Sequence, residues 1–93
     1  MHFSYNNIKF KKHKEENWLM MTGEITNDSD KNYSAVVFRV ILFIHSFPAG
    51  NVNLTIRAFK AWQTKTFEVQ AGDLEYKIIP DISKYEIYTE SAY

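Results

Sequence analysis

Cysteine is absent from this 93-residue chain, and only three glycines and two prolines are present. No disulfide can staple the fold, and no cysteine can act as a nucleophile or a metal ligand. The three glycines are not grouped, so they form no glycine-rich loop for a phosphate. The 11 Lys and Arg residues balance the 11 Asp and Glu residues, whereas nucleic-acid-binding domains are normally basic. We therefore expect no cofactor, no metal site and no specific nucleic-acid partner.

Long apolar runs are also absent. The longest runs, residues 35–38 and 40–44, are separated by Arg39, and both are far shorter than the roughly 18 to 20 residues that cross a bilayer. Residues 1–7 show neither the basic start nor the apolar stretch of a signal peptide. The sequence predicts no membrane span and leaves the compartment open, and its length predicts one domain over residues 1–93.

The chain is instead rich in residues that favour strands. Val, Ile, Thr, Phe, Tyr and Trp account for 35 of the 93 residues, whereas Ala and Leu together account for 10. This composition is typical of β structure. Residues 51–59 alternate, with Val52, Leu54, Ile56 and Ala58 on one side and polar residues on the other, as in a half-buried strand. The repetition of such segments at short spacing predicts an all-β protein, either a sandwich or a barrel.

The expected strands are separated by polar turns at residues 12–16, 27–32, 45–50 and 71–73. At the N-terminus Phe3 and Tyr5 are odd-numbered, whereas Ile8 and Phe10 are even-numbered, so we expect a turn or bulge between the two pairs. Gly23 predicts a bulge or a close backbone approach. The strands that we expect cover residues 3–10, 17–26, 34–44, 51–59, 64–70 and 84–90, with a short seventh at 74–78 that ends before Pro80.

The strand over residues 34–44 is apolar on both faces and is therefore expected at the centre of a sheet. Its even-numbered residues from Val36 to Leu42 should fill the core. The candidate interaction surface consists of the outward-facing residues of that strand and one turn residue: Val37, Arg39, Ile41, Phe43 and Trp62. Three apolar side chains on one outer face suggest a contact with a protein partner or a homodimer. The alternative is cover by the N-terminal strand, by residues 89–93 or by the stem of Arg39.

Three segments resemble the FxLYD family of small immunoglobulin-like modules. They are a Gly-x-Ile-x-Asn strand end at residues 23–27, a following polar turn with the apolar strand 38–44, and a turn and strand at 60–67. The resemblance implies an immunoglobulin-like antiparallel β-sandwich of about seven strands. It also implies a prokaryotic, non-enzymatic module of exported or cell-surface proteins. Ile44 stands where the family tends to have Asp, and Trp62 where it tends to have Gly, which leaves the shape of both loops open.

No residue constellation predicts catalysis or metal binding. His2, His13 and His45 lack the spacing of metal ligands. The pattern Asp28-x-Asp30-x-Asn32 is similar to the opening of a calcium loop, but Tyr33 and Arg39 stand where an EF-hand needs Gly and Glu. No nucleophile elbow is present. We therefore expect a protein that is not an enzyme.

Two features leave alternatives open. Four lysines at positions 9, 11, 12 and 14 either pair with acidic neighbouring strands, which we expect, or bind a polyanion weakly. Trp62 lies in a predicted turn, where it either packs down as a cap on the core edge, which we expect, or stands exposed. The predicted function is accordingly a module for protein interaction or spacing. The alternative is a carbohydrate-binding module that uses exposed aromatic residues such as Trp62.

Overall fold

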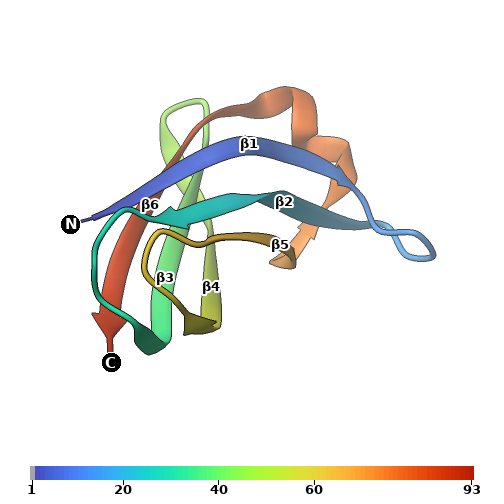
Figure 1. Ribbon diagram of the computed structural model, residues 1–93. Coiled ribbons are helices and arrows are strands. Elements are labelled where there is room, and N and C mark those ends of the chain that lie inside the picture. The colour runs from blue at the N-terminus through green and yellow to red at the C-terminus, as the bar shows by residue number, and fades with distance from the viewer. Residues whose placement is uncertain (1) are drawn as a thin grey trace.

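Two three-stranded antiparallel sheets make up the fold in a computed structural model that describes residues 2–93 (Figure 1). One sheet has the order β1-β2-β5 and the other has the order β4-β3-β6. The elements are β1 (Phe3–Lys12), β2 (Trp18–Asn27), β3 (Tyr33–Ile44), β4 (Phe47–Phe59), β5 (Thr64–Glu75), the 3₁₀ helix η1 (Tyr76–Asp81) and β6 (Ile82–Ala92). The predicted all-β sandwich is confirmed.

The strand order follows immunoglobulin topology. The β1-β2-β5 sheet corresponds to strands A, B and E, and the β4-β3-β6 sheet corresponds to C′, C and F. Hairpins join β1 to β2 and β3 to β4, whereas the other three connections cross between the sheets. Within residues 2–93 no strand takes the place of G, beside β6.

The core lies between the sheets and is centred on β3, which pairs with both β4 and β6. Val36, Phe38, Val40 and Leu42 are fully buried, as alternation along the strand predicted. Burial of one such side chain contributes roughly 1.5 to 3 kcal/mol. The central position of this strand and its core-facing residues are therefore confirmed.

The N-terminal strand contains the expected irregularity. The register between β1 and β2 shifts between Asn6 and Lys9, and Asn7 has a φ of 54°. The shift lets Phe3, Tyr5, Ile8 and Phe10 all pack against the core, although their numbering changes parity. Opposite this bulge, a Cβ on Gly23 would clash with Cδ1 of Ile8. Side chains, rather than the backbone that we expected, therefore approach Gly23 closely, and the bulge lies on its neighbour β1.

The predicted seventh strand at residues 74–78 is wrong. Leu74 belongs to β5, and the chain then turns through η1 at Tyr76–Asp81. Ile78 and Ile79 both pack against the core, which two consecutive residues on a regular strand cannot do because their side chains point to opposite faces. A 3₁₀ turn lets both side chains reach the core.

One predicted turn is shorter than expected, and another is absent. The β3–β4 turn consists of His45 and Ser46, both with positive φ, as in the tight hairpin turns that match strand twist. Pro48 therefore lies within β4, where an edge strand tolerates a residue without an N–H. The segment 71–73 is not a turn, because β5 continues through it with a positive φ at Gly72 and a register shift against β2.

The side chain of Asn27 links several chain segments by hydrogen bonds at one end of the sandwich. It is fully buried, and its Nδ2 donates to the carbonyl oxygens of Lys31, Phe59 and Lys60 at 2.8, 3.4 and 3.1 Å. Its Oδ1 accepts from the main-chain N–H and the hydroxyl of Ser29 at 3.1 and 2.6 Å. One side chain thus connects the end of β2, the β2–β3 loop and the end of β4.

Replacing Asn27 with Ala should destabilise the domain by about 2 to 4 kcal/mol, because several buried polar groups lose their partner at once. The measurement is chemical denaturation followed by circular dichroism. Asn53→Ala is the matched control, since Asn53 is exposed on β4, and it should cost less than about 1 kcal/mol. Equal losses for the two variants would contradict the role of Asn27.

Candidate interaction surface

The outer face of the β4-β3-β6 sheet carries four of the five residues predicted for the interaction surface. Val37, Arg39, Ile41 and Phe43 follow one another along β3 on the side away from the core; we call these four residues the outer row. Arg39 is exposed, and the three apolar side chains are half-buried. The structure thus brings these four residues together as alternation predicted.

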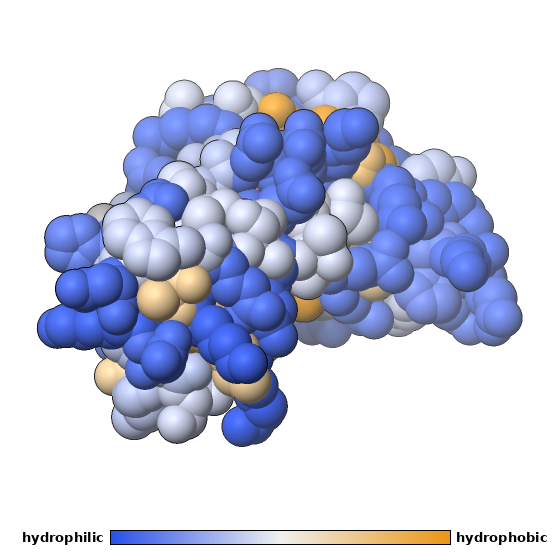
Figure 2. All heavy atoms as spheres, in the orientation of Figure 1, coloured by the Kyte–Doolittle hydropathy of each residue, from blue (hydrophilic) through white to orange (hydrophobic). Residues whose placement is uncertain are grey.

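Polar side chains border the outer row on both sides. Its neighbours on β4 are Pro48, Asn51, Asn53 and Thr55, and those on β6 are Lys84, Glu86, Tyr88 and Ser91. The apolar part of this face is therefore one strand wide, except beside Phe43, where Pro48 extends it onto β4. Figure 2 shows that the visible side of the molecule is mostly hydrophilic or intermediate, with only small, separate hydrophobic areas.

Part of the expected cover over the outer row is present. Nε of Arg39 lies 2.7 Å from Oε1 of Glu90, and the Arg39 guanidinium lies 5.8 Å from the centre of the Tyr88 ring. The ammonium of Lys84 lies 4.5 Å from the centre of the Phe43 ring. The contacts over the outer row thus come from β6, with Glu90 and Tyr88 at Arg39 and Lys84 at Phe43, whereas β1 belongs to the other sheet.

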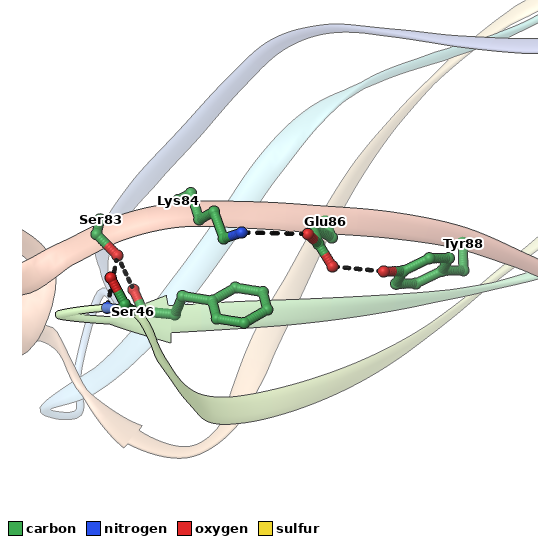
Figure 3. Close-up of polar contacts among 6 residues, drawn as sticks. Ser46, Ser83, Lys84, Glu86 and Tyr88 are labelled. Carbon is green, nitrogen blue, oxygen red and sulfur yellow. Dashed lines mark hydrogen bonds and ion pairs between the residues drawn. The ribbon is translucent and has the colours of Figure 1, made fainter.

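A chain of polar contacts runs along β6 (Figure 3). Glu86 accepts a hydrogen bond from the Tyr88 hydroxyl and lies 3.3 Å from Nζ of Lys84. The hydrogen bond from Tyr88, followed by that from Lys84, lowers the pKa of Glu86, and the same bond to Glu86 raises the pKa of Tyr88. The β6 positions were not among the predicted site residues, although the alternation of Lys84, Glu86 and Tyr88 was a usable signal.

Trp62 lies apart from the outer row. It occupies the β4–β5 turn with a φ of 63°, and it is 66% exposed. The expectation that Trp62 caps the core edge is therefore wrong. A positive φ is rare for residues other than glycine and asparagine. This turn is held by hydrogen bonds from the Lys60 N–H to Gln63 Oε1 and from the Ala61 N–H to Asn32 Oδ1, both 2.9 Å.

The Trp62 ring lines an open hollow of about 340 Å³ at the loop end of the sandwich. The other lining residues come from the N-terminus and the β2–β3 loop, and they are His2, Asp28, Ser29, Asp30 and Lys31. None of the outer row lines this hollow. The five predicted residues therefore occupy two separate places, because Trp62 lies beyond the end of β4, in the crossing to the other sheet.

Two of the three lysines of β1 contact other residues of the domain. Nζ of Lys11 reaches across β2 to Oε1 of Glu68 on β5, at 2.5 Å, and Nζ of Lys12 lies 5.6 Å from the centre of the Tyr76 ring. The hydrogen bond from Lys11 lowers the pKa of Glu68. These contacts favour the interpretation in which oppositely charged strands attract across the sheet.

Over residues 2–93, no three His, Cys, Asp or Glu side chains cluster in a way that could hold a metal ion. No helix in this part of the chain is long and apolar enough to cross a membrane.

No protein-family model, curated protein or solved structure matches the sequence or the fold. The resemblance to FxLYD modules therefore stays a prediction.

Replacing Tyr88 with Phe should raise the pKa of Glu86 toward its usual value, because the hydroxyl that stabilises the carboxylate is lost. Glu86 has a lowered pKa in the folded state, so its contribution to stability is present above its unfolded pKa and is lost as the pH falls through the folded pKa. An NMR titration of the Glu86 carboxyl carbon measures the change. Tyr85→Phe, on the other face of β6, is the control and should leave the pKa of Glu86 unchanged. An unaltered Glu86 pKa in Tyr88→Phe would refute this coupling.

Proposed function

We propose that this domain is a non-catalytic immunoglobulin-like module for protein–protein interaction or spacing within a larger assembly, and that it docks through the outer row. The observation that supports this proposal is the alignment of Val37, Ile41 and Phe43 on the exterior of the central strand, with polar side chains on both sides. Protein interfaces commonly have such an apolar centre with a polar rim. The resemblance to FxLYD modules agrees with this role and favours an exported or surface location.

The outer row suits docking because its support is rigid. β3 is paired on both sides and its inner residues are fully buried, so its outer side chains are held in place before a partner arrives, which lowers the entropic cost of binding. Arg39 and Tyr88 add two residue types that are enriched in binding hot spots. A partner with an apolar strip and an acidic group near Arg39 would be complementary.

Ile41→Glu and Phe43→Glu should each abolish the contact with a protein partner or a second copy, while the far-ultraviolet circular dichroism stays that of a β domain. A buried carboxylate without a partner prevents the docking of an apolar surface. Sedimentation measures self-association, and affinity capture with native and variant chains compares partner binding.

The control is Thr55→Glu, which places the same charge on the same face at an exposed β4 position and should leave the contact intact. If Ile41→Glu or Phe43→Glu unfolds the protein, these residues belong to the core and the outer row is not a docking surface. If both variants still bind, the outer row is likewise not a docking surface.

A second candidate function is carbohydrate binding at the Trp62 hollow. The exposed indole gives a flat apolar face, and Asp28, Asp30 and His2 bring hydrogen-bonding groups to the same hollow. Ligand sites combine apolar or aromatic lining with a few polar groups that fix orientation. The positive φ of Trp62 holds the ring outward at a cost in backbone energy, and such strain often marks functional positions.

Titration with soluble cell-wall and storage polysaccharides should shift the tryptophan fluorescence if Trp62 binds sugar. Trp62→Asn is the matched variant, because Asn tolerates a positive φ and Trp18 remains as the internal reference. The shift should disappear in this variant. No shift with any polymer at millimolar sugar equivalents would remove the carbohydrate function.

A further inference from the structure

β6 is the least protected edge of the two sheets. The edges β4 and β5 contact each other and close one side of the sandwich. The edge β1 is interrupted by the bulge at Asn7 and carries three lysines. β6 contains neither proline nor glycine, and within residues 2–93 it pairs only with β3. Sheets usually protect such edges with prolines, bulges or covering segments.

The middle of β6 is regular. Its pairing with β3 runs without interruption from Phe43↔Lys84 to Phe38↔Thr89, and the register shifts only beyond these two ends. Along a straight antiparallel strand, alternate residues direct their N–H and C=O groups away from the existing neighbour. Residues 84–89 therefore offer main-chain donors and acceptors to another strand. This is also the position that strand G takes in a seven-stranded immunoglobulin sandwich.

We propose that a second copy of this chain pairs with the free edge of β6 in antiparallel orientation about a two-fold axis at Ile87. The two β4-β3-β6 sheets would join into one continuous six-stranded sheet. The proposal goes beyond the docking function of the outer row, because it uses a strand edge rather than a sheet face.

The regular length of β6 and its charges together select this register. An axis at Tyr85 would set Lys84 opposite Glu86, but it would pair only residues 84–86 of the regular segment, whereas an axis at Ile87 pairs residues 85–89. With Ile87 opposite itself, Lys84 lies opposite Glu90 of the second copy, and Glu86 lies opposite Tyr88, which already donates to the Glu86 carboxylate within one chain. Opposite charges facing each other across strands stabilise a pair, and like charges destabilise it. A two-fold axis at Glu86 would place two Glu86 carboxylates together, and an axis at Tyr88 would place Glu86 opposite Glu90.

The inner side of the same edge has apolar surface to cover. Tyr85 is 40% exposed, and its ring lies 6.2 Å from the ring of Phe10 on β1. Ile87, on the same side, is half-buried against the core. In the proposed register, Thr89 of the second copy lies beside Tyr85, and the two Ile87 side chains meet at the axis. A strand pair over residues 84–90 is small, so we expect weak association at the low end of interface areas, below about 1,200 Å².

Sedimentation of the full chain over roughly 5 to 500 µM, a range suited to a small interface, should show a mass rising from 11.0 kDa toward twice that value. Lys84→Glu and Glu90→Lys should each weaken dimerisation about tenfold, because each creates two like-charge pairs across the axis. The double variant, which combines Lys84→Glu with Glu90→Lys, again places opposite charges across the axis. Its dimerisation affinity should therefore return to within about threefold of the native value.

A chain that stays monomeric over this range overturns the proposal, even if β6 binds a peptide from another protein. If the double variant dimerises no more strongly than either single variant, the proposed register is wrong. Lys84→Glu and Glu90→Lys also remove contacts to Phe43 and Arg39 of the outer row. Recovery of dimerisation in the double variant is expected only for the edge pair, so this outcome separates the β6 edge from the outer row, which Ile41→Glu and Phe43→Glu test.

A second measurement uses the absence of native cysteine. Directly opposed side chains in an antiparallel pair have Cβ atoms about 4.5 to 5.5 Å apart, so Ile87→Cys should form a disulfide-linked dimer under mild oxidation. Asn53→Cys, exposed on β4, is the control and should link much more slowly. Equal rates for the two variants overturn the two-fold axis at Ile87.

Discussion

The fold depends on the constraint that β3 has a neighbour on each side and a fully buried inner face. Because side chains alternate along a strand, a slip of one residue would move Phe38 and Val40 out of the core and bring Arg39 into it. The buried row therefore fixes the register of both β4 and β6 against β3. It also fixes which side chains form the outer row, so the candidate interaction surface follows from the packing of the core.

Asn27 plays a corresponding part at the loop end. β-Sandwiches must close where strands cross from one sheet to the other, and main-chain carbonyl groups there lack the partners that a sheet provides. The amide of Asn27 supplies those partners for residues on both sides of the crossing. With this end held, the neighbouring turn accommodates Trp62 at a positive φ, with its ring directed toward solvent rather than the core.

The two long sides of the sandwich differ, and this difference connects structure to function. On one side β4 and β5 approach each other and their inner residues are well covered. On the other side, within residues 2–93, no further strand lies beside β6, and Tyr85 is covered only in part by Phe10. The outer row and the β6 edge meet along this second side through Arg39, Lys84 and Glu90. Both proposed contacts use the β4-β3-β6 sheet, whereas in the β1-β2-β5 sheet Lys11 pairs with Glu68.

The sequence by itself determined the features that depend on local periodicity: the existence of six strands, the core-facing residues of β3 and the bulge near Asn7, because alternation is a property of neighbouring residues. It did not determine η1, where Ile78 and Ile79 turn toward a core made by distant strands, nor the exposure of Trp62, which depends on a turn held by Asn27 and Asn32. Only the tertiary structure decided the contacts of Arg39 with Glu90 and of Lys11 with Glu68. These pairs join strands far apart in the sequence, and their meeting depends on sheet order and register, which no local pattern contains.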